Sequence, residues 1–374
     1  MTAPALHDEP PIVLVAASVT TINDRHGPHD RLSQSFRGKR VLVTGGASFI
    51  GSHLTDLLLE AGAEVTVADD LSSGRRENLS AVMADLRFLE LDLRHAEHAA
   101  RAAAGQEVVF HLAAAHGGRG YIESHPVECV NNMLLDHVVF AAAAAAGVQR
   151  IVYASSACVY PTRLQASASD RLLLKEADCN FIEPGGAQAD GEYGWAKLMG
   201  ELQLNAFVKQ YGLSATACRL FTSYGERENE SHAVIALIAK AVARLDPYPL
   251  WGTGTQTRNF TYVMDTVTGM ALAGAAFDGF ATINIGTDTH HTILALTDEI
   301  FRALGWTPNT IERQLDKPVG VQSRAADLTK SRARLDWAPQ VDLAEGIRRT
   351  AEWYRTAYGE TCRERLATYL TGRS

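Results

Sequence analysis

A short apolar segment followed by a glycine-rich turn near residue 40 limits most strongly what this chain can fold into. Residues 39–43 read Lys-Arg-Val-Leu-Val, residues 44–51 read Thr-Gly-Gly-Ala-Ser-Phe-Ile-Gly, and an amphipathic helix is predicted to follow as far as Glu60. This order of strand, glycine turn and helix binds phosphate in other proteins, because a helix N-terminus presents free N–H groups to it. The segment therefore predicts a dinucleotide-binding fold. The turn residues expected to contact the cofactor are Gly45, Ser48, Phe49, Ile50 and Gly51.

Two of these glycines have separate tasks, and one position departs from the usual motif. Gly45 permits the tight turn, and Gly51 permits close packing of the helix on the strand. Ser48 stands where a glycine is usual, and it adds a Cβ where the backbone approaches phosphate.

Strands and helices alternate along the first half of the chain. Further strands are predicted at residues 64–68, 86–91, 107–111, 150–154 and 215–220, with an alanine-rich helix at residues 132–146. This alternation predicts an α/β fold built on a doubly wound parallel sheet of the Rossmann type. Ligands of such sheets bind outside the carboxyl ends of the strands. The segments predicted at these ends are the glycine turn, Asp69, Asp92, residues 113–115 and residues 155–158.

An acidic residue, Asp69, ends the second predicted strand. A carboxylate at this place can accept both hydroxyls of the adenosine ribose and repels a 2′-phosphate, which favours NAD over NADP. A turn or helix-cap aspartate is the alternative. Further predicted cofactor contacts are Asp92, Leu93 and Ala113, together with Tyr193 and Lys197.

Tyr193 and Lys197 are spaced as Tyr-x-x-x-Lys in a segment predicted to be helical over residues 193–211. Two residues four apart lie on one face of a helix. A lysine beside a tyrosine favours the phenolate, so that the tyrosine can take a hydroxyl proton near neutral pH. Ser155 and Ser156 follow a predicted strand and can hold the same oxygen. The tyrosine–lysine spacing becomes specific only because a dinucleotide fold precedes it.

With these motifs the chain resembles the extended short-chain dehydrogenases/reductases, in their NAD-dependent nucleotide-sugar epimerase/dehydratase group, over residues 38–357. Within the group it most resembles the GDP-mannose 3,5-epimerases. The segments that carry the resemblance are His116–Gly120, Ser155–Pro161 with cysteine at its fourth place, Trp251–Arg258, Gly320–Arg324 and Leu335–Pro339.

The resemblance implies NAD as cofactor, a nucleotide-diphosphate hexose as substrate, and a transient 4-keto intermediate. Oxidation of the C4 hydroxyl makes the C3 and C5 protons acidic, and NAD can take that hydride and return it. Tyr193 is then the base for the hydroxyl. Lys197 holds Tyr193 as the phenolate and contacts the nicotinamide ribose, and Ser156 is the catalytic serine.

Inversion of a carbon next to the ketone needs a second acid–base pair. The resemblance places Cys158 as one partner and a lysine as the other, but His232 stands in the lysine's place, before a helix predicted at residues 232–243. We expect the helix N-terminus to lower the pKa of this histidine and to favour neutral imidazole as a base. A small buried hydrophobic role for Cys158 and a surface cap role for His232 are the alternatives. Inversion at C5 alone, which gives the L-gulose product, and at C3 and C5, which gives L-galactose, both stay open.

Arginines are the predicted ligands of the diphosphate. Arg258 and Arg324 can form forked, charge-assisted hydrogen bonds with it, and surface salt bridges are the alternative. Lys240 is a weaker candidate, since it can lie on a solvated helix face. The predicted substrate residues are Gly117, Gly118, Arg119, Ser156, Thr222, Lys240, Arg258 and Arg324.

The chain is predicted to form two domains with additions at both ends. Residues 38–225 and 256–287 are assigned to the NAD-binding domain, and residues 226–255 and 288–360 to a second, smaller α/β substrate domain. Residues 1–37 are an N-terminal extension with an apolar strand or helix at residues 12–19 and a polar linker at residues 23–38, and residues 361–374 are a loosely held tail. Short strands are predicted at residues 260–263 and 281–285, and helices at residues 298–304, 327–334 and 343–358.

Composition excludes several other classes of partner. A net charge of -8 and a pI of about 5.9 disfavour a general nucleic-acid binder. The five cysteines are odd in number and lack metal-ligand spacing, which predicts reduced thiols in a cytoplasmic protein without a metal site. No apolar run approaches the ~18 residues of a membrane span. By resemblance we expect a homodimer packed through two helices.

Three other functions are the alternatives to this prediction. A UDP-hexose 4-epimerase would use the same tyrosine, lysine and NAD but would not need Cys158 or His232. A 4,6-dehydratase usually carries an Asp-Glu pair near the serine, where Ala157 and Cys158 stand here. A non-catalytic NAD-binding protein is disfavoured because both Tyr193 and Lys197 are present.

Overall fold

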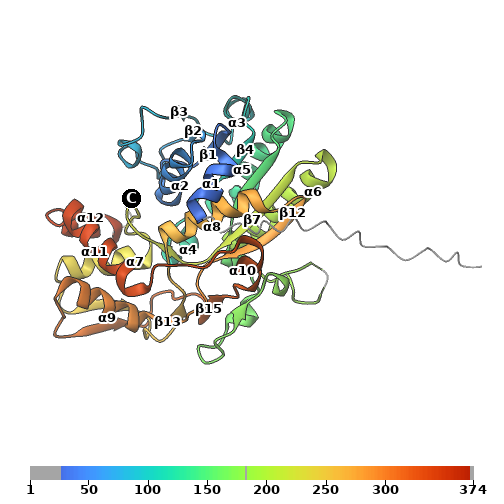
Figure 1. Ribbon diagram of the computed structural model, residues 1–374. Coiled ribbons are helices and arrows are strands. Elements are labelled where there is room, and N and C mark those ends of the chain that lie inside the picture. Colours follow the sequence, from blue (N-terminus) through green and yellow to red (C-terminus); the bar gives the residue numbers. More distant parts are fainter. Residues whose placement is uncertain (1–26, 182, 371–374) are drawn as a thin grey trace, which may run out of the picture.

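The computed structural model describes residues 27–181 and 183–370 (Figure 1). The apolar strand or helix predicted at residues 12–19 lies outside the described residues. The main sheet has seven parallel strands in the order β12-β7-β5-β4-β1-β2-β3, which confirms the predicted doubly wound fold. Its strands are β1 Arg40–Thr44, β2 Glu64–Asp69, β3 Arg87–Glu90, β4 Val108–His111, β5 Arg150–Ser156, β7 Ser214–Leu220 and β12 Phe280–Ile285.

The strand order reverses beside β1, and this reversal creates the place where a ligand can bind. Val41 of β1 pairs with Val65 on one side and with Val108 on the other. The chain therefore winds outward in both directions from β1 and β4, and the connections diverge above the carboxyl ends of these two strands. In open parallel sheets the crevice at such a reversal is the usual ligand site.

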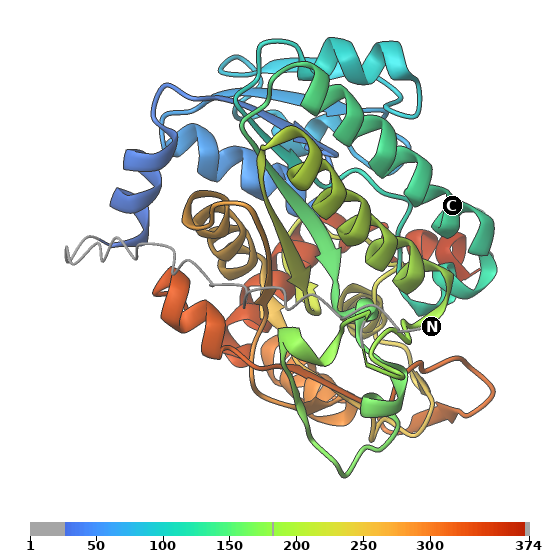
Figure 2. The same cartoon turned by 90° about the vertical axis from the view of Figure 1, so that its right-hand side faces the viewer.

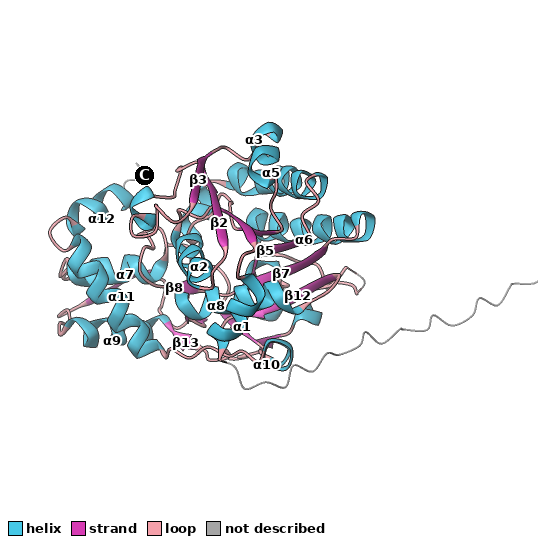
Figure 3. Ribbon diagram, turned by 45° about the horizontal axis from the view of Figure 1, so that its top comes forward, coloured by secondary structure: helices cyan, strands magenta, loops and turns pink. Residues whose placement is uncertain are grey.

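Both faces of the main sheet are covered by helices (Figure 3). Side chains alternate across a strand, so Val41 and Val43 enter one core cluster and Leu42 enters the other. One face packs against α3 Ala96–Ala103, α5 Pro126–Ala145 and α6 Gly191–Tyr211. The other packs against α1 Pro28–Phe36, α2 Phe49–Glu60 and α8 Val263–Ala276.

The smaller lobe lies at the lower left of Figure 1. A four-stranded sheet with the order β13-β10-β15-β6 stands beside the helices of this lobe, and β14 pairs with β9. The helices of this lobe are α7 Ala233–Val242, α9 Ile293–Leu304, α11 Leu343–Tyr358 and α12 Cys362–Leu370. Helix α10 Thr329–Leu335 packs instead against α8 and the edge strand β12 of the main sheet. The short strands are β6 Leu173–Leu174, β8 Ser223–Tyr224, β9 Tyr248–Trp251, β10 Thr257–Arg258, β11 Thr261–Tyr262, β13 His291–Thr292, β14 Ile311–Gln314 and β15 Ser323–Ala326. The remaining short elements are η1 Arg76–Leu79, α4 Arg119–Ser124, η2 Ala157–Val159, η3 Thr162–Gln165 and η4 Glu176–Asp178.

The predicted linker at residues 23–38 is wrong for the part that forms α1. Leu32 and Phe36 of α1 are buried in the core, and the Arg31 guanidinium donates to the carbonyl oxygen of Leu335 at 2.7 Å. A polar segment with only two apolar residues looks like a linker. Those two residues are four apart and face one side of a helix, which suffices to dock it.

The predicted loose tail is wrong for α12. Cys362 and Leu366 are buried, again four residues apart, and α12 packs against α7. The Arg365 guanidinium donates twice to the Glu230 carboxylate. The C-terminal helix is therefore a packed part of the smaller lobe.

Helix α8 was not predicted from the sequence. It is apolar on all sides because the sheet and other helices enclose it, so it shows no amphipathic period. An added Cβ at Gly269 would lie 3.0 Å from the Trp337 ring, and one at Gly274 would lie 3.0 Å from Phe110. The strand predicted at residues 260–263 is shorter than expected, and it pairs with β8. The strand predicted at residues 281–285 does join the main sheet, as β12.

Helix α5 is longer than predicted and is apolar enough, by length and composition alone, to cross a membrane. It lies instead between α3 and α6 on the sheet. Its inner face buries the polar residues Asn132 and Asp136, which hydrogen-bond to residues that follow or belong to the strands. Such buried hydrogen bonds are typical of a core helix.

The docking of α1 can be tested by one substitution. Phe36→Ala should lower the free energy of unfolding by about 3–5 kcal/mol, because it leaves a cavity between α1 and the sheet. Gln34→Ala, at an exposed position of the same helix, should change it by less than about 0.5 kcal/mol. Urea denaturation measures both, and equal small effects would show that α1 does not contribute to the core.

Candidate active site

A cavity of about 380 Å³ opens at the carboxyl edge of the main sheet, and both lobes contribute to its wall. It contains all five predicted catalytic residues and all eight predicted substrate residues. Four predicted cofactor residues, Asp69, Asp92, Leu93 and Ala113, lie outside its wall. The predicted residues that line it are Gly45, Ser48, Phe49, Ile50, Gly51, Gly117, Gly118, Arg119, Ser156, Cys158, Tyr193, Lys197, Thr222, His232, Lys240, Arg258 and Arg324.

The glycine turn forms a cradle that side chains would fill. Gly45 has φ +68°, and an added Cβ there would lie 2.9 Å from the backbone nitrogen of Ala113. At Gly51 it would lie 2.1 Å from the carbonyl oxygen of Gly45. Ser48 is the N-cap of α2 and makes no side-chain capping bond, so the first amides of the helix have no partner within it. This cradle fits the pyrophosphate of NAD, which residues 45–51 would hold.

Asp69 fastens the glycine turn to the end of β2. Its carboxylate accepts from the amides of Ala47 and Leu71, each at 2.9 Å, and it is buried. Burial raises the pKa of Asp69, and the two amides oppose this shift. Ionised carboxylate oxygens can accept further bonds, which leaves capacity for ribose hydroxyls. The residue predicted as a cofactor ligand thus also shapes the turn.

The other cofactor residues outside the cavity wall have partners within the protein. Asp92 forms a forked pair with Arg94 at 2.9 and 2.8 Å, and this contact lowers the pKa of Asp92 to about 2. Leu93 belongs to the core cluster on the α3, α5 and α6 face. Ala113 packs its backbone against Gly45.

Ser155 and Ser156 both line the cavity, but the Ser155 hydroxyl is engaged in a buried network of the protein. Ser155 donates to the Glu201 carboxylate at 2.5 Å, and Arg219 holds the same carboxylate at 3.0 and 2.8 Å. This network is buried and structural. Ser156 ends β5, accepts from the amide of Cys158 at 3.1 Å, and hydrogen-bonds to Tyr193.

Burial sets the protonation of the tyrosine–lysine pair. The Lys197 ammonium lies 4.8 Å from the ring centre of Tyr153 and 5.9 Å from that of Tyr193. Burial raises the pKa of Tyr193 and lowers that of Lys197, against the charge of Asp136. The lysine alone does not offset the burial of the tyrosine.

A buried polar chain beneath the pair was missed by sequence reasoning. Thr44 Oγ1 lies 2.7 Å from His111 Nδ1, His111 Nε2 lies 3.0 Å from Asp136, and Tyr153 donates to Asp136 at 2.5 Å. Asp136 is fully buried, and its charge favours the protonated form of Lys197. The members are far apart in sequence, so no local pattern reveals the chain.

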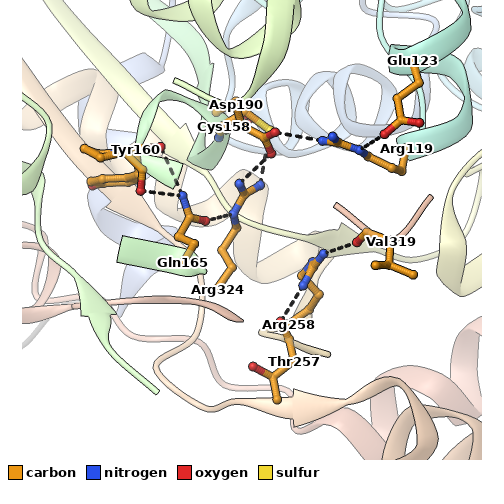
Figure 4. Close-up of polar contacts among 12 residues, drawn as sticks. Arg119, Glu123, Cys158, Tyr160, Gln165, Asp190, Thr257, Arg258, Val319 and Arg324 are labelled. Carbon is orange, nitrogen blue, oxygen red and sulfur yellow. Dashed lines mark hydrogen bonds and ion pairs between the residues drawn. The ribbon is translucent and has the colours of Figure 1, made fainter. Parts of the chain in front are cut away.

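Asp190 joins two predicted substrate arginines (Figure 4). Its carboxylate accepts from Arg119 at 2.9 Å and from Arg324 at 3.0 Å. Arg324 also donates to Gln165 at 2.5 Å and to the Cys158 sulfur at 3.3 Å. Sequence reasoning missed both Asp190 and Gln165, although the position of Asp190 just before the Tyr193 helix was a usable signal.

Of the other basic residues in the cavity wall, Lys240 is buried and Arg258 is half-buried. Arg258 donates to the carbonyl oxygens of Thr257 and Val319 at 2.7 and 2.8 Å. Burial and then the charge of Arg324 lower the pKa of Arg258 to about 9, so a nearby anion would stabilise both guanidinium groups. Lys240 donates to a backbone carbonyl at 3.0 Å, and burial lowers its pKa to about 8. The alternative of a solvated helix face for Lys240 is wrong.

His232 lines the cavity from the N-cap of α7, beside His116. The two ring centres are 5.7 Å apart. Burial lowers the pKa of His232 to about 3, with the charge of His116 adding to it, and lowers that of His116 to about 4. The expected direction is found, and burial is its largest cause. His232 does stand at the N-cap, as the alternative had it, but its side chain makes no capping bond and lines the cavity.

The loop that carries His116 packs tightly on the loop that carries His232. An added Cβ at Gly118 would lie 1.9 Å from the carbonyl oxygen of Ser231. The absence of a side chain at Gly118 therefore allows the two histidines to approach each other.

Comparison with known proteins places the chain among nucleotide-sugar enzymes. It matches the NAD dependent epimerase/dehydratase family over residues 41–286. It is 31% identical over 322 residues to GDP-mannose 3,5-epimerase 1 of Oryza sativa subsp. japonica, covering 84% of this chain and 82% of the relative. It is 32% identical over 322 residues to UDP-glucose 4-epimerase of Mycolicibacterium smegmatis, covering 84% of this chain and 98% of the relative. The structure of UDP-glucose 4-epimerase from Thermotoga maritima with UDP-glucose gives a TM-score of 0.73 at 28% identity, covering 85% of this chain and 99% of that one.

A dinucleotide-binding sheet with a Tyr-x-x-x-Lys pair at its ligand edge is the architecture of the extended short-chain dehydrogenases/reductases, the class predicted from the sequence. Within that class the chain belongs to the NAD dependent epimerase/dehydratase family and is an NAD-dependent nucleotide-sugar epimerase. The predicted cofactor is thereby confirmed.

The contribution of the Asp190 carboxylate to stability can be tested by replacing it with asparagine. Asp190→Asn should lower the free energy of unfolding by about 3 kcal/mol, because a buried guanidinium loses its counter-charge. Asp288→Asn, which loses an exposed pair with Arg332, should change it by less than about 1 kcal/mol. Urea denaturation measures the free energy of unfolding of both variants. Equal losses would mean that Asp190 contributes no more to stability than an exposed ion pair.

Proposed function

We propose that the protein is an NAD-dependent epimerase of a GDP-hexose. It converts GDP-mannose to GDP-L-gulose by inversion at C5, or to GDP-L-galactose by inversion at C3 and C5, through a transient 4-keto sugar. The observation that carries the proposal is that Cys158 and His232 line the same cavity as Ser156, Tyr193 and Lys197. A C4 epimerase has no need of such a second pair of proton-transfer groups.

The first step of the proposed reaction belongs to the tyrosine, serine and lysine. Tyr193 takes the proton of the C4 hydroxyl, Ser156 holds its oxygen, and Lys197 supplies positive charge beside them. When bound, NAD accepts the C4 hydride and later returns it. The carbonyl formed at C4 acidifies the neighbouring C–H bonds.

The second step inverts a carbon beside that carbonyl. One of Cys158 and His232 removes a proton from one face, and the other delivers a proton to the opposite face. Neutral imidazole is the prevailing form of His232 near pH 7, since burial holds its pKa at about 3. The diphosphate lies against Arg258, Arg324 and Lys240 in this proposal. The hexose lies against Thr222 and the loop that contains Gly117, Gly118 and Arg119.

UDP-hexose 4-epimerisation is the second candidate. It is supported by the 32% identity with the Mycolicibacterium smegmatis UDP-glucose 4-epimerase, which the match covers almost completely. That reaction would use only Ser156, Tyr193, Lys197 and NAD.

We also propose a homodimer formed through α5 and α6, which lie side by side (Figure 2). Val127 and Leu134 of α5 are 64% and 67% exposed, and Trp195 and Leu202 of α6 are 40% and 46% exposed. Each pair is seven residues apart and so lies on one face of its helix. A second copy of the same two helices would cover this surface.

An incubation with GDP-mannose in D₂O tests the proposed reaction. NMR should show deuterium entering at C5, or at C3 and C5, together with the inverted product. Cys158→Ala should reduce this incorporation by roughly 10²-fold or more. Cys362→Ala, on α12 and away from the cavity, should not. Conversion of a UDP-hexose at C4 without exchange from GDP-mannose would refute the proposal.

Sedimentation equilibrium tests the dimer. The wild-type chain should sediment as a dimer, and Leu134→Glu with Leu202→Glu should sediment as a monomer, because two charges would be buried at the interface. A monomeric wild type would contradict this part of the proposal.

A further inference from the structure

One buried carboxyl group in the cavity wall has no task in the reaction described above. The Glu228 side chain is only 2% exposed, and its Oε1 lies 3.3 Å from Nδ1 of His232. Its Oε2 is buried and has no hydrogen-bond partner among the described residues. Burying an unpaired carboxylate costs several kcal/mol, so the group is expected to be neutral or to have a function.

The basic residues nearest in sequence and space do not neutralise Glu228. Arg227 pairs with Asp56 at 2.8 Å. Arg365 pairs with Glu230. Both also line a small pocket beside Glu228, but each has its own carboxylate. Burial raises the pKa of Glu228 well above its usual range, in agreement with an uncharged carboxyl.

His232 is held so that its two nitrogens have different environments. Nδ1 lies 3.3 Å from Oε1 of Glu228 and 3.4 Å from the Ser231 hydroxyl, while Nε2 makes no hydrogen bond among the described residues. The ring lines the large cavity. A carboxyl O–H that donates to Nδ1 fixes the tautomer with the proton on Nε2.

Cys158 has the opposite environment. Arg324 donates to its sulfur at 3.3 Å. The thiolate is the form of cysteine that accepts a proton. The guanidinium places a fixed positive charge beside that sulfur. The two candidate groups for inversion therefore differ in kind: one lies against a fixed cation and the other against a neutral acid.

We propose that Glu228 is a positioning residue that makes His232 the proton donor and leaves Cys158 as the proton acceptor. This inference rests on the proposed epimerase function. It reverses the sequence-based expectation that His232 acts as the base.

The proton and electron balance is as follows. The Cys158 thiolate takes the proton of the carbon beside the ketone, and the electrons of that C–H bond form the enolate. The enolate carbon then takes the Nε2 proton of His232 from the opposite face, while Nδ1 takes the Glu228 proton. A thiolate and a carboxylic acid become a thiol and a carboxylate, so the total charge is unchanged.

The enzyme must then be reset by solvent. A pocket of about 20 Å³ lies beside Glu228 and His232, and its wall includes the polar residues Ser48, Asn78 and Asn229. This volume holds about one water molecule. Water there can return a proton to Glu228 while Cys158 releases one to the large cavity.

The Glu228→Gln variant separates this role from a structural one. Its amide can still donate to Nδ1 but cannot give up a proton. In D₂O with NAD and GDP-mannose, Cys158 should still exchange the C5 hydrogen of unconverted substrate, and NADH should still form transiently. Inversion should fall by roughly 10²-fold or more. Glu226→Gln is the matched control, since Glu226 bonds to Tyr262 and lines neither pocket, and it should behave as wild type.

Two results would overturn the inference. A Glu228→Gln variant that inverts as fast as wild type would remove Glu228 from proton transfer. Equal losses of exchange, NADH formation and inversion would show a merely structural role.

An infrared measurement tests the carboxyl independently of the substrate. The difference spectrum between wild-type and Glu228→Gln protein, recorded near neutral pH, should contain the C=O stretch of a protonated carboxylic acid. Carboxylate bands in its place would overturn the inference. If this C=O band is present but GDP-mannose neither exchanges nor inverts, the proposed function fails while the neutral Glu228 stands.

Discussion

The arrangement of the active site depends on the ion pairs that the Asp190 carboxylate forms with two arginines. Asp190 stands at the N-cap of the helix that carries Tyr193, accepts from Arg119 in the first half of the chain, and accepts from Arg324 in β15. Arg324 in turn contacts Cys158. One buried carboxylate therefore links the helix that carries Tyr193 to the arginine that contacts Cys158, across elements contributed by distant parts of the sequence.

The two halves of the proposed chemistry are supported differently by the fold. Ser156, Tyr193 and Lys197 rest on the main sheet and on α6, above the buried chain through His111 and Asp136. His232 and Glu228 lie on a loop that leads into the smaller lobe. The proposed hydride transfer thus uses residues of the main sheet and α6, while the proposed proton transfer at carbon also uses residues of the loop that leads into the smaller lobe.

Local patterns explain which parts of the fold the sequence predicts. The glycine turn and the strands that end at the ligand edge were predicted because each is a short segment with its own period or turn chemistry. Helix α8 was missed because complete enclosure removes the amphipathic period, and α1 and α12 were missed because two apolar residues suffice to dock each. Tertiary packing decides such elements.

The residues of the candidate site likewise fall into those that the sequence predicts and those that only the structure reveals. Residues in contiguous motifs, such as Tyr193 and Lys197, could be found by reading along the chain. The partners that set their behaviour could not, because Asp136, Gln165 and Asp190 act through contacts with residues far away in sequence. Glu228 is only four residues from His232, but its burial and its unpartnered oxygen are visible only in three dimensions.

The double use of Asp69 has a consequence for engineering the cofactor preference. Its carboxylate accepts the amides of Ala47 and Leu71, so a small neutral residue introduced to admit a 2′-phosphate would also release the glycine turn. A redesigned NADP-dependent enzyme would need new acceptors for both amides. The cofactor preference of this protein therefore cannot be changed at Asp69 without also changing the geometry of the glycine turn.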